Sequence, residues 1–136
     1  MRRVLILATL LAAACGPPPP GTPAEVRETI DWGHLGTWSG RGDMQTESFL
    51  GEIGALRLRW ETRNPQEPGA GSFHVTVHSA VSGRTMADVI QTTGAGAGTA
   101  FVSDDPHLFY LVIDAHGLDW SIIVEEPVAR RSASAR

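Results

Sequence analysis

The sequence predicts an all-β domain, an antiparallel β-sandwich or jelly roll of about seven to eight short strands. From residue 30 onward the apolar residues come in short runs, and clusters of glycine and other turn-forming residues separate these runs. In this part of the chain no window of a dozen residues keeps the i, i+3, i+4, i+7 apolar spacing of an amphipathic helix. The 136 residues are enough for one such domain with a tail at each end.

Two runs alternate between apolar and polar side chains, as a strand with one buried face does. Residues 56–60 read Leu-Arg-Leu-Arg-Trp, and residues 73–78 read Phe-His-Val-Thr-Val-His. Residues 64–71 between them are rich in turn formers, so we expect the two strands to pair antiparallel through a long loop. The outward side chains are either an ordinary solvated face or a polar binding face. The candidate binding residues are Arg57, Arg59, His74, Thr76 and His78.

Two further strands are predicted toward the end of the chain. Residues 108–113 are apolar on both faces, which predicts a strand in the middle of a sheet that is covered on both sides. Residues 118–124 alternate again, and residues 115–117 predict a short hairpin connection between the two. Residues 84–91 fit one helical turn as well as a strand. Weaker strands are predicted at residues 36–39, 47–50 and 98–102.

The first 14 residues have the three-part layout of a secretory signal. Arg2 and Arg3 lie at its start, an apolar run covers residues 4–11, and three alanines precede Cys15. This run is shorter than the roughly 20 residues that a membrane-spanning helix needs, so it predicts a segment that is removed on export.

The residues before Cys15 resemble the lipobox of bacterial lipoproteins, in which a leucine and small residues precede a cysteine. Leu11 lies one place further from Cys15 than in the commonest pattern, and Ala12 stands where leucine is usual. The resemblance implies that Cys15 is diacylated and anchors the protein in the cell envelope, in the outer membrane if the host has two membranes. Residues 12–14 also form an Ala-x-Ala site for ordinary cleavage at the same bond, and the alternative product is secreted with a free cysteine.

Composition divides the rest of the chain into three parts. Residues 15–29 contain the cysteine and a run of prolines, which predict a lipidated cysteine followed by an extended spacer. Residues 30–128 contain the predicted strands of the sandwich domain. Residues 129–136 have no apolar side chain larger than alanine, which predicts a disordered tail.

The charge of the chain argues against nucleic acid as a partner. All eleven basic residues are arginines, and two of them lie in the expected signal. The nine that remain, set against 15 acidic residues, give a formal charge of 9 − 15 = −6 after residue 14. A protein that binds nucleic acid needs a basic patch to neutralise phosphates, so we expect no such partner.

Residues 38–125 contain glycines at the predicted turns and apolar residues at the inward positions of the predicted strands. The positions are Gly40, Thr46, Phe49, Phe73, Val75, Val77, Gly83, residues 94–99, residues 110–117 and residues 120–124. This layout resembles small exported bacterial β-sandwich modules and is similar to pre-peptidase C-terminal and CUB-like domains. Because these are core and turn positions, the resemblance implies the fold and implies no activity.

No motif in the sequence predicts a catalytic centre or a cofactor. Residues 36–40 (Gly-Thr-Trp-Ser-Gly) miss the Gly-x-Ser-x-Gly spacing of a serine hydrolase by one residue. His74 and His78 would lie about 13 Å apart along a strand, too far to share a zinc ion. Asp104 and Asp105 are the candidate calcium ligands, although turn formation is the usual role of aspartate in such loops. We therefore expect no enzyme, no cofactor and no metal, with calcium in that loop as the alternative.

These features favour a lipid-anchored, non-catalytic sandwich that binds or scaffolds at the cell envelope. Its expected partners are the membrane, through the anchor, and an envelope protein or a glycan. Two alternatives are kept: an accessory or glycan-binding domain that serves a partner enzyme, and a hydrolase without a recognisable motif.

Overall fold

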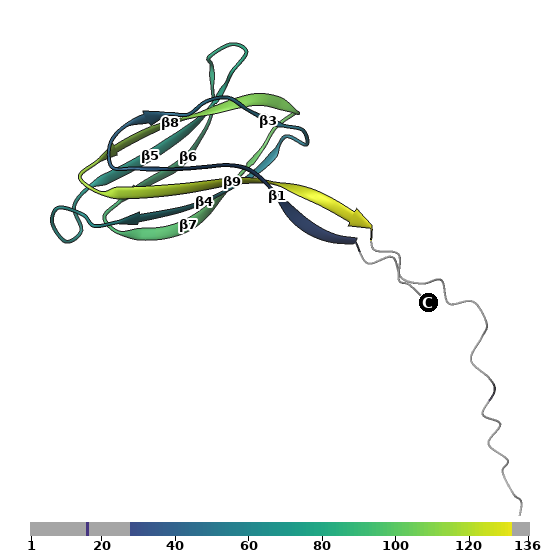
Figure 1. The fold of residues 1–136 in the computed structure, drawn as a ribbon, viewed down its shortest axis with the longest axis horizontal. Helices are drawn as coiled ribbons and strands as arrows, with labels where there is room; N and C mark the ends of the chain where they lie inside the picture. The colour runs from purple at the N-terminus through teal and green to yellow at the C-terminus, as the bar shows by residue number, and fades with distance from the viewer. Residues whose placement is uncertain (1–15, 17–27, 132–136) are drawn as a thin grey trace, which may run out of the picture.

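The predicted β-sandwich is confirmed by a computed structural model, which describes residue 16 and residues 28–131 (Figure 1). Two antiparallel sheets pack face to face. Cys15, the expected signal and residues 132–136 lie outside the described residues. The strands are β1 (Glu28–Gly40), β2 (Met44–Gln45), β3 (Phe49–Gly51), β4 (Ala55–Arg63), β5 (Ser72–Ser79), β6 (Thr85–Thr93), β7 (Gly96–Ser103), β8 (His107–His116) and β9 (Asp119–Arg131).

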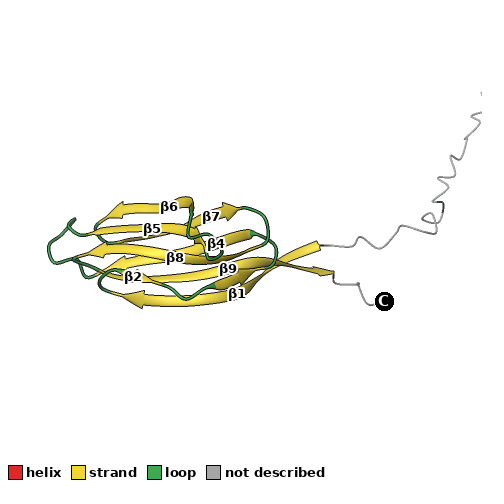
Figure 2. Cartoon of the chain, turned by 90° about the horizontal axis from the view of Figure 1, so that it is seen from above, coloured by secondary structure: helices red, strands yellow, loops and turns green. Residues whose placement is uncertain are grey.

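The strand order is β1-β9-β4-β7 in the four-stranded sheet and β2-β8-β5-β6 in the five-stranded sheet, where β3 also pairs with β8. Among the long strands only β5 and β6 are neighbours in both sequence and sheet. The short strands β2 and β3 both pair with β8, and every other connection between the described strands carries the chain from one layer to the other. Figure 2 shows the resulting stack of strands, with loops between them and no helix among the described residues.

Two predicted strand pairings are wrong. The strands at residues 56–60 and 73–78 lie in β4 and β5, which belong to different sheets, and β8 and β9 are separated in the same way. The connecting loops contain residues with positive φ, such as Asn64 (50°) and Gly117 (68°), where the chain turns across the sandwich. Turn-forming residues show that a chain changes direction, but they do not determine which sheet the next strand joins.

The core between the sheets contains the side chains that the alternation of apolar and polar residues predicts to point inward. Leu56 and Leu58 of β4 are buried, whereas Arg57 and Arg59 lie on the outer side. The largest fully buried side chains are Trp120, Phe73, Phe109, Leu56, Leu58, Leu111, Ile113, Leu118, Ile122, Val75, Val77 and Val124.

Strand β8 has a middle position in its sheet, as predicted, but the prediction that both of its faces are covered is wrong. Phe109 and Leu111 are buried, whereas Leu108 on the other face is 43% exposed. On that outer face the rings of Tyr110 and His78 stack with centroids 5.1 Å apart. A run of apolar residues therefore does not by itself distinguish a covered strand from one with an open apolar face.

Strands β1 and β9 pair from Glu28 opposite Arg131 to Gly40 opposite Trp120, with a shift of register between His34 and Gly36. They run past the body of the sandwich as a two-stranded ribbon, so both ends of the described domain lie side by side (Figure 1). The predicted domain limits, residues 30 and 128, fall inside these two strands.

The weaker predicted strands are confirmed, since residues 36–39 lie in β1, residues 98–102 in β7, and residues 49–50 of the stretch 47–50 in β3. Residues 84–91, which fitted a helical turn or a strand, lie almost wholly in β6. Within the described part of the chain there is no helix of the length and apolar character that spanning a membrane requires.

Candidate functional site

The outer face of the four-stranded sheet has a row of cross-strand neighbours that are polar or aromatic. Phe101 of β7 lies opposite Arg57 of β4, Arg57 lies opposite Glu125 of β9, and Glu125 lies opposite His34 of β1. With strands about 4.8 Å apart, the row crosses the sheet over roughly 14 Å. We call these four residues together with Trp32 and Arg59 the Arg–aromatic face.

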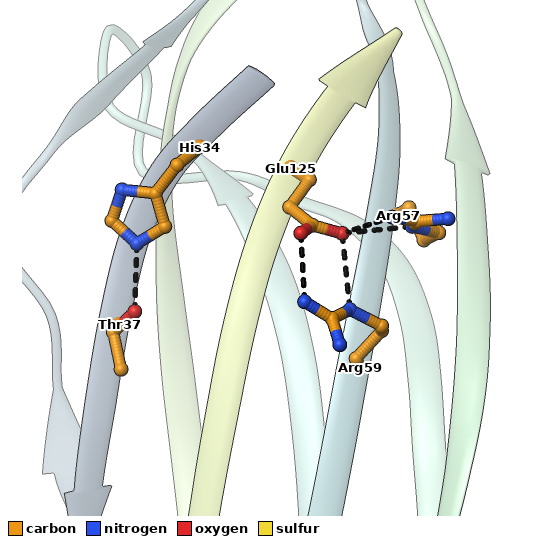
Figure 3. Close-up of polar contacts among 5 residues, drawn as sticks. All are labelled: His34, Thr37, Arg57, Arg59 and Glu125. Carbon is orange, nitrogen blue, oxygen red and sulfur yellow. Dashed lines mark hydrogen bonds and ion pairs between the residues drawn. The ribbon is translucent and has the colours of Figure 1, made fainter. Parts of the chain in front are cut away.

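Glu125 is the centre of the polar contacts on this face (Figure 3). Arg59 donates two hydrogen bonds to the carboxylate, from Nη2 at 2.8 Å and from Nε at 3.1 Å. Arg57 approaches the same carboxylate with Nη2 at 2.6 Å and Nε at 2.8 Å. The Glu125 side chain is only 10% exposed, so the two guanidinium groups hold it in a partly dehydrated position.

These contacts change the proton affinity of the carboxyl group. The hydrogen bonds from Arg59 have the largest effect, and with those from Arg57 and both positive charges they lower the pKa of Glu125, although partial burial acts in the opposite direction. The same contact raises the pKa of Arg59.

On the neighbouring strand β1, the Nε2 atom of His34 lies 2.7 Å from the hydroxyl of Thr37 (Figure 3).

We expect Glu125→Gln to lower the free energy of unfolding by about 1 to 2 kcal/mol at neutral pH, because the amide keeps the shape but loses the charge-assisted hydrogen bonds. A lowered folded-state pKa gives stability that is present above the ordinary carboxyl pKa and is lost as the pH falls through the folded-state value. The difference between wild type and variant should therefore shrink in the acid range. Urea melts at a series of pH values measure it.

The matched control for this prediction is Glu61→Gln, since Glu61 lies on the same strand face as the arginines but is 52% exposed, with Nε of Arg63 at 3.8 Å. Exposed ion pairs of this kind contribute little to stability, so this variant should melt close to wild type at every pH. A pH-dependent loss of equal size in both variants would contradict the role assigned to Glu125.

Aromatic rings form the other part of the Arg–aromatic face. The guanidinium carbon of Arg57 lies 3.8 Å from the centroid of the Trp32 ring, which is cation–π geometry. The rings of Trp32 and Phe101 are tilted by 51° with centroids 6.3 Å apart. Phe101 is 68% exposed and Trp32 is 36% exposed. Exposed aromatic side chains gathered beside charged groups are typical of interaction surfaces.

The predicted binding residues do not share one face. Arg57 and Arg59 lie on the four-stranded sheet, whereas His74, Thr76 and His78 lie on β5 in the other sheet. The error follows from the wrong pairing of β4 with β5, because two strands of different sheets turn their outer faces in opposite directions.

The three β5 residues have structural contacts of their own. The Nε2 atom of His74 lies 2.7 Å from the Asp88 carboxylate on the neighbouring strand β6. The hydroxyl of Thr76 lies 2.9 Å from Nε2 of His78, whose ring stacks on Tyr110. These cross-strand and same-strand contacts are the ordinary interactions of a solvated sheet face.

Asp104 and Asp105, the candidate calcium ligands, form a turn. The backbone N–H of Asp105 donates to the Asp104 carboxylate at 2.7 Å, and the N–H of Asp104 donates to the Gly54 carbonyl at 3.0 Å. Within the described residues neither aspartate belongs to a group of three acidic or histidine side chains that could hold an ion. The contacts fit the usual role of aspartate in turns.

The structure brings together a different set of potential metal ligands, Asp43, Asp114 and His116, which were not predicted as ligands from the sequence. Their ligand atoms all lie within 4.8 Å of one another, and all three residues are exposed. Each also has a protein partner: His116 Nε2 lies 2.9 Å from Asp114, and Asp43 accepts a hydrogen bond from the Ala115 N–H at 2.9 Å. Asp114 and His116 are two residues apart on one strand face, a visible signal, but nothing in the sequence places Asp43 beside them.

One serine–histidine contact, between Ser79 and His107, lies outside the Arg–aromatic face and outside the group of potential metal ligands. The hydroxyl of Ser79 lies 2.5 Å from Nε2 of His107, and it also accepts hydrogen bonds from the N–H groups of Val81 and Ser82, each at 3.2 Å. Ser79 is only 3% exposed. The hydroxyl therefore organises the turn after β5 and is not open to a substrate.

The described residues define a class of protein, a small all-β domain of two packed antiparallel sheets with an Arg–aromatic face on one of them. No family model, no curated protein and no solved structure matches the chain. Function must therefore be argued from the residues and their geometry.

Proposed function

We propose that this protein is a lipid-anchored, non-catalytic binding module of the cell envelope, with the Arg–aromatic face as its binding surface. The observation that carries the proposal is the position of β1, the first described strand after Cys15 in the sequence. It begins at the tip of the ribbon that extends past the sandwich (Figure 1). A tether that precedes this strand is attached at the tip of the ribbon, so it leaves the outer faces of both sheets accessible.

The segment between Cys15 and β1 supports a tether of this kind. Residues 16–27 are twelve residues rich in proline, glycine and small polar side chains. At about 3.1 Å per residue in an extended polyproline conformation, such a spacer reaches roughly 37 Å. The domain can then bind a partner at a distance from the lipid surface.

The polar contacts of the described residues support binding rather than catalysis. Buried side-chain nitrogen and oxygen atoms in this part of the chain all have a hydrogen-bond partner. The carboxylate of Glu125 is occupied by two arginines, and the hydroxyl of Ser79 is occupied by His107 and a turn. A catalytic group needs a free position toward a substrate, which these two lack.

The anchor is tested by Cys15→Ser in a bacterial host that processes lipoproteins. Two acyl chains bury enough methylene groups, at about 0.8 kcal/mol each, to hold a protein firmly in a membrane. We expect the wild-type protein in the membrane fraction, with an intact mass that includes the diacylglyceryl group. The variant should lack this mass and accumulate as unprocessed precursor.

The outcome that contradicts the anchor is a soluble wild-type chain that begins at an unmodified Cys15. Such a chain would show that the Ala-x-Ala site is used, and the protein would then be secreted. An exposed binding face would still be present, because it does not depend on Cys15.

A further inference from the structure

We propose that the Arg–aromatic face binds an acidic glycan, a polysaccharide whose sugar rings bear carboxylate groups. This inference rests on the proposed function only in taking that face as the binding surface. The face offers two complementary features. One is the exposed aromatic ring of Phe101. The other is a pair of arginine side chains that Glu125 holds in place (Figure 3).

Phe101 provides the stacking surface for a sugar ring. Its side chain is 68% exposed, although a phenylalanine on a small domain is usually buried. It lies on β7, the edge strand of the four-stranded sheet, where no other described strand pairs with it on the outer side. The face of an aromatic ring carries partial negative charge, and the C–H groups of a sugar ring carry partial positive charge, so the two surfaces attract each other.

Arg59 provides hydrogen-bond donors for a carboxylate. It uses Nε and Nη2 to bind Glu125, and in Figure 3 its third nitrogen has no contact with the residues drawn. The side chain is 48% exposed, so the unused donors can reach a ligand. Because Glu125 fixes the planar guanidinium group, little side-chain entropy is lost when a second carboxylate binds.

The charge of the face favours an anionic ligand. Within the face, Arg57 and Arg59 outnumber Glu125 by one positive charge, whereas the whole chain has a formal charge of −4. The neighbouring Glu61 is matched by Arg63. The acidic side chain of Asp119 at the start of β9 is paired with Arg41 at 3.0 Å. A local excess of positive charge on an acidic protein attracts an anion to that region.

The shape of the face favours a glycan over an acidic peptide. The hollow beside Arg59 measures about 180 Å³ and is lined by Arg59, Trp60, Glu61, Ala97, Ser121 and Ile123. That is smaller than the roughly 300 to 1,000 Å³ of pockets that enclose a ligand. A peptide that adds to a sheet pairs its backbone with a free strand edge, such as that of β7, and not with the side chains of the face. A sugar chain can lie across the nearly flat row of side chains itself.

The test uses the mature lipoprotein in detergent micelles and measures its affinity for polygalacturonate and for alginate, both of which carry carboxylates. We expect binding that weakens with added salt, and we expect Phe101→Ala and Arg59→Gln each to weaken it about tenfold. The matched control is Leu108→Ala, which removes a 43% exposed apolar side chain from the outer face of the other sheet and should change affinity less than about twofold. Thermal melting of each variant confirms that it is folded.

Two further probes test whether binding needs both the sugar rings and the carboxylate charge. Fully methyl-esterified polygalacturonate has the same sugar rings without charge, and polyglutamate has the charge without sugar rings. Equal binding of the ester, equal binding of polyglutamate, no binding of either uronate polymer, or unchanged binding by Phe101→Ala would each overturn the proposal. Intact mass and membrane fractionation of the same preparation report on the anchor independently, so failure here leaves the tether unaffected.

Discussion

Trp120→Ala is expected to lower the free energy of unfolding by about 3 to 5 kcal/mol, the range for removing a large buried aromatic side chain. Trp120 is 1% exposed, and its ring stacks on Phe73 with centroids 5.9 Å apart. Its Nε1 atom also donates a hydrogen bond to the Gly42 carbonyl at 3.0 Å. The variant therefore loses packing between the two sheets and leaves a buried cavity. Urea melts followed by circular dichroism measure the change.

The controls for this variant are His74→Ala and His78→Ala on the outer face of the five-stranded sheet. Each removes a partly exposed ring with local contacts, and each should stay within about 0.5 kcal/mol of wild type. If all three variants melted alike, the inner and outer faces assigned to β5 and β9 would be wrong. A loss confined to Trp120→Ala supports the common core.

The faces of the strands could be predicted from the sequence better than their arrangement. Alternation in residues 56–60 and 73–78 correctly placed the apolar side chains inward, because a period of two is a local property of a strand. The assignment of β4 and β5 to one sheet was wrong, because pairing depends on contacts between residues far apart in the chain. The β1–β9 ribbon, which joins opposite ends of the domain, has no local signal of this kind.

The candidate site shows the same division. Arg57 and Arg59 were identified as outward-facing, but Glu125, which both arginines contact, was not included in the predicted face. Glu125 has the outward phase of β9, which is visible in the sequence, yet only the pairing of β9 with β4 shows which residues it meets. The exposed Phe101 was read as part of an ordinary strand, since sequence alone does not report how much of an apolar side chain is covered.

Gly54→Ala is expected to lower the free energy of unfolding by about 2 to 4 kcal/mol, through backbone strain and a steric clash together. Gly54 has φ of 82°, and a Cβ atom there would lie 2.0 Å from the backbone carbonyl oxygen of Asp104. Asp104 also donates its backbone N–H to the Gly54 carbonyl oxygen at 3.0 Å. The turn at Asp104 therefore cannot move away from Gly54 without losing that hydrogen bond. This loop lies where β4 begins and β7 ends, two strands that carry the Arg–aromatic face.

Two other glycines separate strain from clash in the same experiment. Gly69 has φ of 76° but nothing within 4 Å of an added Cβ, so Gly69→Ala should show the strain alone, about 1 kcal/mol. Gly42 has neither feature, and Gly42→Ala should stay within about 0.5 kcal/mol of wild type. Urea melts should therefore rank the losses as Gly54, then Gly69, then Gly42. If Gly54→Ala lost no more stability than Gly69→Ala, the contact between the turn at Gly54 and the turn at Asp104 would not be part of the folded state in solution.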